Sequence, residues 1–387
     1  MTLDLIPFSR PYRTPDELRY LDEVLTSGHG QGDGPFTQRA NALITAITGA
    51  PHRLLTPSGT HALELAFWLL DLEPGDEVVV PSFTFTSTAA AVVQVGAVPV
   101  FVDVDPRTGN MDPAAFAAAV TPRTRAVCVV HYGGVGVDVD AIAAIAEPND
   151  IRIVEDNAHG LGASWRGRKL GTLGDVAAQS FHATKNVHAG EGGALLTGSD
   201  ELADRAEVIR EKGTDRSRFL RGQVDKYSWV DRGSSFLLSE LGAAVLTGQL
   251  EHFDEIQRLR HAVWDAYATG LAGWAAGSGW SLMHVPAEAE HPAHVFYVLA
   301  PDHAGQTEML SHLRSRGVQG TFHYVPLDTS AAGRRFGRTP SPCTVTADFS
   351  SRLVRLPLWA GLTDAQVDRV LDAVVSFVPA SSAQGRA

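Results

Sequence analysis

Short apolar segments alternate with stretches of helical periodicity from about residue 54 to residue 200, and this alternation constrains the fold most strongly. Strands are predicted at residues 77–80, 98–103, 126–131, 151–155, 177–180 and 194–197. Helices are predicted between them at residues 61–70, 86–95, 113–120 and 139–146. Strands that alternate with helices pair in parallel, so the pattern predicts a layered α/β domain with its ligand at the carboxyl ends of the strands.

The C-terminal part predicts a second, smaller domain. Apolar spacing indicates a helix at 201–212, one or two helices over 239–271, strands at 295–300 and 319–324, and helices at 306–316 and 364–377. We predict an N-terminal segment at 1–15, a large α/β domain at 16–258, a small α+β domain at 259–379 and a disordered tail at 380–387. The length of 387 residues is sufficient for both domains.

Composition excludes several classes of protein. The 44 acidic and 32 basic side chains give a net charge of −12, which argues against a nucleic-acid partner. No apolar stretch approaches the ~20 residues needed to cross a bilayer, and the start does not resemble a signal peptide, so no membrane partner is expected. Cys128 and Cys343 lie far apart without metal-ligand spacing, which predicts no metal site and favours the reducing cytoplasm.

A lysine stands between a predicted strand and a glycine-rich turn in the segment SFHATKNVHAGEGG, residues 180–193. Glycine lets a backbone approach a flat cofactor closely. Burial lowers the pKa of a lysine, so that a neutral Lys185 amine would be available to react with a carbonyl group. A surface lysine before a hairpin turn is the alternative for this segment taken alone.

An acidic residue ends the apolar strand that leads into EDNAHG, residues 155–160. A carboxylate at this position, Asp156, can pair with a protonated pyridine nitrogen and make such a ring an electron sink. His159, three residues further on, is placed to contact a phenolic oxygen of the same ring. Helix capping by Asp156 is the alternative interpretation.

Two further segments suggest a phosphate site and an aromatic surface. The sequence TPSGT, residues 56–60, opens a predicted helix, and the free N–H groups of a helix start bind phosphate. Phe83 and Phe85 follow the strand at 77–80, and an aromatic residue at the carboxyl end of a strand can stack on a planar ring. An ordinary helix cap and a core aromatic are the alternatives. In combination, the four segments supply what pyridoxal 5′-phosphate (PLP) requires.

The order SGT, PSFTF, EDNAHGLGA, SFHATK and GEGGALLT resembles that of the sugar aminotransferase (DegT/StrS) family, fold-type I PLP enzymes, over nearly the whole chain. Residues 209–241, with FVDVDP at 101–106 and FHYVPL at 322–327, resemble the dTDP-4-amino-4,6-dideoxygalactose transaminase branch. The resemblance implies an aspartate aminotransferase-like fold, with a large domain built on a mostly parallel sheet and a smaller C-terminal α+β domain. It also implies a homodimer with shared active sites.

The resemblance assigns roles to single residues. Lys185 is expected to carry the cofactor and to move protons, and Asp156 is expected to pair with the pyridine nitrogen. Further cofactor contacts are expected at Gly59, Thr60, Phe85, His159, Ser180 and Ser235. The Ser235 contact would come from the partner subunit, at a position where the family usually has asparagine.

Candidate substrate contacts come from two other places. Arg221 and Lys226, in a basic cluster at 216–226, are expected to bind the diphosphate of a sugar nucleotide. A solvated loop is the equal alternative for this cluster. His323 and Tyr324, on the predicted strand at 319–324, are expected to reach the sugar, although a strand edge also explains them.

The expected reaction moves an amino group from L-glutamate to C4 of dTDP-4-keto-6-deoxyglucose, giving a dTDP-4-amino-4,6-dideoxyhexose and 2-oxoglutarate. Alternatives are transfer to C3 of a 3-keto sugar, a PLP-dependent sugar dehydratase, and a non-catalytic regulator that binds PLP or a sugar nucleotide. Dehydratase relatives replace the lysine with histidine, so Lys185 argues against that alternative. The complete set of cofactor residues argues against a regulator.

Overall fold

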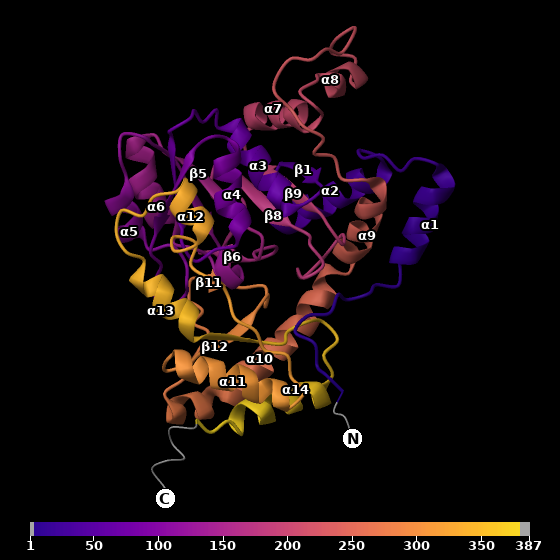
Figure 1. Cartoon of the computed structure of the whole chain (residues 1–387). Helices are drawn as coiled ribbons and strands as arrows, with labels where there is room; N and C mark the ends of the chain where they lie inside the picture. Colours follow the sequence, from indigo (N-terminus) through magenta and orange to yellow (C-terminus); the bar gives the residue numbers. More distant parts are fainter. Residues whose placement is uncertain (1–3, 380–387) are drawn as a thin grey trace, which may run out of the picture.

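The computed structural model describes residues 4–379 (Figure 1). Its centre is a seven-stranded sheet in the order β1-β9-β8-β5-β4-β2-β3. The strands are β1 (His52–Thr56), β2 (Glu77–Pro81), β3 (Val98–Val102), β4 (Thr124–Val130), β5 (Arg152–Asp156), β8 (Val176–Ser180) and β9 (Gly193–Thr197). The pairs β3–β2, β2–β4, β4–β5 and β5–β8 are parallel. The predicted α/β class with a mostly parallel sheet is therefore confirmed.

Helices cover both faces of this sheet because successive strand residues point to opposite sides. Val78 and Val80 pack with α3, α4 and α7 on one face. Val79 packs with α5 and α6 on the other face, where α1, α2 and α9 cover the β1–β9–β8 end. The bounds are α1 (Glu17–Ser27), α2 (Pro35–Thr48), α3 (Gly59–Leu69), α4 (Thr86–Gln94), α5 (Pro113–Ala119), α6 (Val139–Ala146), α7 (Asp200–Arg210), α8 (Arg216–Leu220) and α9 (Glu240–Glu251).

A separate hydrophobic cluster lies at the C-terminal end of the molecule, at the bottom of Figure 1. There the long α10 (Phe253–Ser278), α11 (His303–Ser315) and α14 (Asp364–Val375) pack on a sheet in the order β10-β12-β13. Its strands are β10 (Ser281–Leu282), β12 (Phe296–Leu299) and β13 (Leu353–Leu356). Ile6 joins this cluster through a bridge to Val318, so the start of the described chain lies with its end.

Short elements complete the chain between these two clusters. They are β6 (Ser164–Trp165), β7 (Arg168–Lys169), β11 (Ala289–Glu290), α12 (Ala331–Phe336) and α13 (Thr344–Arg352). The tail at 380–387, predicted to be disordered, lies outside the described residues. Within residues 4–379 no helix is long and apolar enough to cross a bilayer.

The sheet departs from parallel pairing at one end, within the mostly parallel arrangement that was predicted. β9 pairs antiparallel with both β8 and β1. The chain passes from β8 to β9 through residues 181–192 without a helix, and strands joined in this way run antiparallel. Two reversals leave β1 and β8 running in the same direction, so their carboxyl ends share the edge to which β5 and β2 also point.

The strand predicted at 319–324 is not formed. Only Thr321 forms a bridge there, to Arg355. The rings of His323 and Tyr324 then stack with centroids 3.6 Å apart, and Pro326 follows without an N–H group to donate to a ladder. This stretch is irregular backbone that enters the central pocket instead of extending the small sheet.

The carboxylate of Glu240 connects α9 to the start of α2. It is 1% exposed and accepts hydrogen bonds from the backbone N–H groups of Gly34, Phe36 and Thr37 at 2.8–3.1 Å. These N–H groups belong to the first turn of a helix, where no intrahelical acceptor exists. Glu240 therefore caps the N-terminus of α2, a role that is usually filled by the side chain of the N-cap residue, which Gly34 lacks.

We expect Glu240→Ala to destabilise the protein by about 3 kcal/mol, because buried donors lose their acceptor. Glu240→Gln keeps one carbonyl oxygen and should cost less. Urea denaturation of both variants beside wild type measures the difference. Equal midpoints for wild type and Glu240→Ala would contradict this role for Glu240.

Candidate active site

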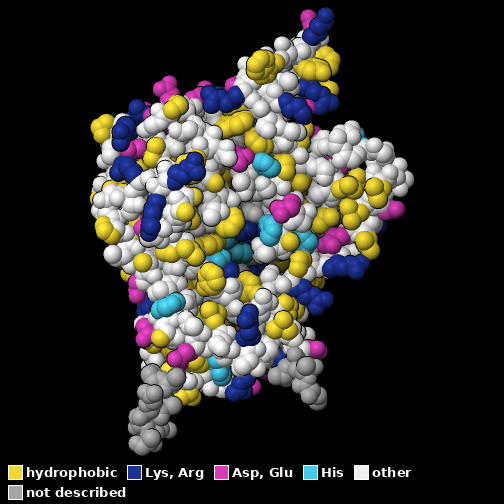
Figure 2. Space-filling view, in the orientation of Figure 1, with side chains coloured by type: hydrophobic (Ala, Val, Ile, Leu, Met, Phe, Trp, Pro, Cys, Tyr) yellow, Lys and Arg dark blue, Asp and Glu magenta, His cyan; other side chains and the backbone are white. Residues whose placement is uncertain are grey.

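One pocket brings together most of the residues predicted from the sequence. It opens as the hollow at the centre of Figure 2, with histidine and basic side chains inside it. The predicted residues that line it are Gly59, Thr60, Phe85, Asp156, His159, Ser180, Lys185, His323 and Tyr324. They come from the shared carboxyl edge of the large sheet and from the irregular stretch beside the small sheet.

Lys185 lies in the tight loop between β8 and β9. Its backbone N–H donates to His182 O at 2.8 Å, and the loop is closed by a bond from Ala183 N to Gly190 O at 2.8 Å. Gly190 has φ +79°, a conformation that favours glycine. Burial lowers the pKa of the Lys185 amine to about 8, while the charge of Asp156 opposes this shift. About a tenth of the amine is therefore neutral at pH 7, far more than for an ordinary lysine.

Asp156 is the last residue of β5 and is 5% exposed. Thr88 Oγ1 donates to its Oδ2 at 2.7 Å, and Ala158 N–H donates to its Oδ1 at 3.2 Å. Burial raises the pKa of Asp156, whereas the hydrogen bond from Thr88 opposes that rise. The second hydroxyl, that of Thr84, lies 2.8 Å from Thr88 Oγ1 and orients it. The carboxylate is thus fixed in direction and has room for a cationic partner.

His159 has a fixed tautomer. Its Nδ1 lies 3.2 Å from the backbone N–H of Gly133 and accepts that hydrogen, so Nε2 carries the proton. Burial holds the pKa of His159 well below its ordinary value, which keeps the ring neutral. The ring stacks on His294 at a centroid distance of 4.3 Å. His159 therefore presents one N–H donor, suited to an oxygen that bears partial negative charge.

The start of α3 forms a phosphate cradle. Ser58 Oγ accepts from His61 N at 3.1 Å and Ser58 O accepts from Ala62 N, which leaves the N–H groups of Gly59 and Thr60 pointing out of the helix. A Cβ on Gly59 would lie 2.9 Å from the Cβ of Ser180, so only glycine fits against this strand end. Backbone donors at a helix N-terminus bind phosphate.

Phe85 supplies a flat apolar surface between these groups. It is 57% exposed although it lies inside the pocket, and the nearest ring, that of Tyr324, is 6.3 Å away. An aromatic face left free in this way can stack on a planar ring. Cradle, face, carboxylate, N–H donor and amine together match the donor and acceptor groups of PLP, so the residues present fit this cofactor.

The predicted residues of the basic cluster and Ser235 do not line this pocket. They lie on an arm at residues 211–238 that contains α8 and projects from the body at the top of Figure 1. Arg221 is bound to Glu207 at 2.8 Å, and Ser235 forms an antiparallel bridge with Glu211. Lys226 is exposed. Within one chain, none of them reaches Lys185.

Among the residues at the site that the sequence did not predict, three are informative. Thr88, His294 and Arg355 lie in α4, just before β12, and in β13 respectively. The sequence could have indicated Thr88, because it follows Phe85 by three residues and faces the same edge of the large sheet. His294 precedes a strand of the small sheet and Arg355 lies within another, and nothing in their local sequence distinguishes them from ordinary polar residues.

Comparison with known proteins gives the class of this fold and site. The profile of the DegT/DnrJ/EryC1/StrS aminotransferase family matches residues 11–375. The spore coat polysaccharide biosynthesis protein SpsC of Bacillus subtilis (strain 168) is 35% identical over 382 residues, 96% of this chain and 97% of that protein.

Solved structures agree with this match. The aminotransferase TlmJ from Streptoalloteichus hindustanus superposes with a TM-score of 0.88 at 31% identity, covering 96% of this chain and 98% of that one. The PLP form of a putative sugar aminotransferase, Spr1654 from Streptococcus pneumoniae, also gives 0.88, at 26% identity, covering 96% and 98%.

The fold and pocket therefore define a PLP-dependent aminotransferase, an enzyme. The chain belongs to the DegT/DnrJ/EryC1/StrS aminotransferase family, which includes sugar aminotransferases. Within the described part of the chain no cluster of His, Cys, Asp or Glu side chains is arranged to hold a metal ion.

We expect the rate of PLP attachment to the apoprotein to rise with pH through about 8, because only the neutral Lys185 amine attacks a carbonyl. Asp156 raises the pKa of Lys185, so Asp156→Asn should move the curve to lower pH. Stopped-flow absorbance of the lysine-bound cofactor gives both curves, with the exposed Asp150→Asn as control. A midpoint near the ordinary lysine value of 10.5 would contradict the burial argument.

Proposed function

We propose that the enzyme transfers an amino group from L-glutamate to C4 of a nucleotide-linked 4-keto-6-deoxysugar, dTDP-4-keto-6-deoxyglucose. The products are a dTDP-4-amino-4,6-dideoxyhexose and 2-oxoglutarate. The observation that carries the proposal is the buried Lys185 amine in one pocket with Asp156, His159 and the helix start at Gly59. The relatives named for polysaccharide biosynthesis and sugar amination support a sugar as the acceptor.

PLP, when bound, supplies a carbonyl carbon for the amino group and an electron sink for the carbanion that forms beside it. Lys185 holds the proton that moves between the cofactor carbon and the substrate carbon. Its lowered pKa suits both directions of that transfer, because a base near neutrality can take up and release a proton. Its place in a closed loop keeps Nζ on one face of the reacting atoms.

Asp156 and His159 hold the charges of the ring. The Asp156 carboxylate, whose orientation Thr88 fixes, would accept a hydrogen bond from the pyridine nitrogen. His159, whose Nδ1 accepts from Gly133, would donate its Nε2–H to the ring oxygen. Both groups are buried, so water competes weakly for these bonds.

A second copy of this chain would complete the site. The arm at residues 211–238 exposes large hydrophobic side chains at Phe219, Leu220, Tyr227, Trp229 and Val230. Trp229 is 78% exposed, so in a monomer most of its apolar surface would remain in contact with water. We propose a homodimer in which each arm covers the partner's pocket, bringing Ser235 to the phosphate and Arg221 and Lys226 to the nucleotide.

The compartment proposed is the cytoplasm. Both cysteines, Cys128 and Cys343, are free and buried, which suits a reducing environment.

His323 and Tyr324 enter the pocket beside Tyr132, whose hydroxyl lies 3.2 Å from His323 Nδ1. These polar groups are the proposed contacts of the sugar hydroxyls.

The activity is tested by incubating the PLP-loaded enzyme with L-glutamate and dTDP-4-keto-6-deoxyglucose and identifying the product by NMR. We expect an amino group at C4, and no product from Lys185→Ala. A glutamate-dependent change in cofactor absorbance without a sugar product would leave the enzyme class intact and reject this substrate. An amino group at C3 would replace the proposed position with the alternative one.

The dimer is tested with Leu220→Glu/Trp229→Glu. Two charges on the arm should prevent apolar contact between copies, so we expect a monomer with strongly reduced activity. Sedimentation velocity measures the mass of wild type, the arm variant and Val375→Glu, a control exposed on α14. A monomeric wild type, or an arm variant that remains dimeric, would contradict the proposed interface.

A further inference from the structure

The side chain of Asn186, the residue that follows Lys185, uses both ends of its amide. Its Nδ2 donates to the backbone carbonyl of Pro292 at 2.7 Å and to Gln257 Oε1 at 2.9 Å. Its Oδ1 lies 2.8 Å from His294 Nδ1. Asn186 is 7% exposed, so these partners replace water. One buried amide therefore connects the lysine loop to α10 and to the segment that precedes β12.

These contacts decide which nitrogen of His294 carries hydrogen. The carbonyl of Pro292 can only accept a hydrogen bond, so the NH2 group of Asn186 must face it. The Oδ1 of Asn186 then faces His294 and accepts from its Nδ1, which must be protonated. Burial holds the pKa of His294 well below its ordinary value, and the charge of Lys185 lowers it further. The ring of His294 is therefore neutral, and Asn186 sets its orientation.

The backbone that carries His294 is held in an unusual conformation. Ala293 has φ +49°, a left-handed conformation that is costly for a residue with a Cβ. The carbonyl of Pro292, just before it, accepts from Asn186. The carbonyls of Ala293 and His294 accept from the buried guanidinium of Arg260 at 3.0 and 2.7 Å. Strain that buried side chains hold in place indicates that the direction of the next side chain, His294, matters.

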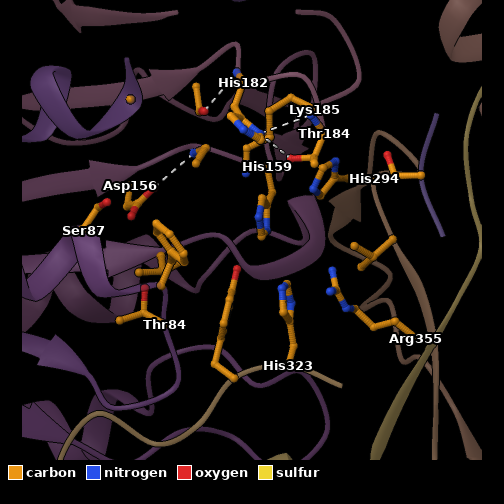
Figure 3. Close-up of a pocket in the computed structure, with 18 of the residues that line it drawn as sticks. Thr84, Ser87, Asp156, His159, His182, Thr184, Lys185, His294, His323 and Arg355 are labelled. Carbon is orange, nitrogen blue, oxygen red and sulfur yellow. Dashed lines mark hydrogen bonds between the residues drawn. The ribbon is translucent and has the colours of Figure 1, made fainter. Parts of the chain in front are cut away.

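The ring of His294 packs on His159, the neutral imidazole proposed to face the ring oxygen of PLP. The two ring centroids are 4.3 Å apart and the ring planes are inclined by 29° (Figure 3). The hydrogen bond from Gly133 N–H to His159 Nδ1, at 3.2 Å, fixes the tautomer of His159. One hydrogen bond leaves a ring free to tilt about that bond, whereas a stacked neighbour limits the tilt. Asn186 therefore restrains His159 by holding the ring that stacks on it.

We propose that Asn186 is a positioning residue for the cofactor: by holding His294 against His159, it keeps the Nε2–H of His159 directed at the ring oxygen. Asn186 itself does not line the central pocket, so it acts through His294. The inference rests on the proposed contact between His159 and the ring oxygen, but not on the identity of the sugar.

The measurable consequence is the pKa of the nitrogen that joins Lys185 to bound PLP. When this nitrogen loses its proton, the ring oxygen beside it is left with more negative charge. An N–H donor stabilises that charge, so a well-directed His159 keeps the pKa low. Loss or misdirection of the donor therefore raises the pKa.

The test titrates the absorbance of the PLP-loaded protein for wild type, Asn186→Leu and a matched control, Asn149→Leu. Leucine has nearly the shape of asparagine and forms no side-chain hydrogen bonds. Asn149 is exposed, and its amide donates to the carbonyl of Ile145 at 2.8 Å without lining the pocket. We expect the pKa to rise by about 1 in Asn186→Leu, as for the weakening of one hydrogen bond to a charged group. Asn149→Leu should match wild type.

A double-variant cycle shows whether Asn186 acts through His159. His159→Ala removes the donor, so the pKa should rise by at least as much as in Asn186→Leu. If the effect of Asn186 passes through that donor, the double variant should have the same pKa as His159→Ala alone. A full additional rise in the double variant would overturn the proposal, because Asn186 would then act independently of His159.

His294→Leu tests the same connection from its other end. This variant removes the ring that stacks on His159 and leaves the lysine loop with its asparagine, so it replaces Asn186→Leu if that protein does not fold. We expect a rise in pKa of similar size. An unchanged pKa in folded His294→Leu would overturn the proposal.

Two outcomes separate this inference from the cofactor contact on which it rests. If His159→Ala and Asn186→Leu both keep the wild-type pKa, the contact between His159 and the ring oxygen is wrong and the inference fails with it. If His159→Ala raises the pKa and Asn186→Leu does not, the contact stands and the role of Asn186 is wrong.

Discussion

Burial of the Lys185 amine beside the Asp156 carboxylate is the interaction on which the rest of the structure depends. Burial lowers the pKa of the amine and raises the pKa of the carboxylate. Other groups must therefore hold each side chain in place. The loop from His182 to Gly190 fixes the amine, and Thr88 fixes the carboxylate. Burying charge in this pocket therefore costs free energy, and the loop and Thr88 fix where the charged groups lie.

The sheet makes this arrangement possible. β1, β2, β5 and β8 point to one edge, so residues far apart in the chain meet there without long loops. The antiparallel β9 turns the chain back at that edge and closes the lysine loop. The small sheet and the segments beside it then face the same edge from the other side and contribute Arg355, His294 and His323. The residues proposed to hold the cofactor thus lie at the edge of the large sheet, and the residues proposed to contact substrates lie on the opposite side of the pocket.

The sequence located the pocket residues at the edge of the large sheet more completely than those on the opposite side of the pocket, for a physical reason. Gly59 and Lys185 follow strands and Asp156 ends one, so local periodicity already places them at one edge. Arg355 lies within a strand and becomes a pocket residue only because the small sheet packs against the large one, which no local pattern reports. The same limit explains the error at 319–324, where ring stacking of His323 on Tyr324 replaces strand pairing. β9 is antiparallel because the loop before it, residues 181–192, contains no helix. The sequence already lacks a helical pattern in that loop.

The central claim is that Lys185 alone carries the cofactor, and the chain offers a direct measurement. It contains four lysines: Lys169, Lys185, Lys212 and Lys226. Borohydride reduction of the PLP-loaded protein, followed by peptide mass spectrometry, locates the attachment. The account predicts one modified peptide, containing Lys185, and none once glutamate has been added before reduction. Modification of another lysine, or an unmodified chain, would contradict it.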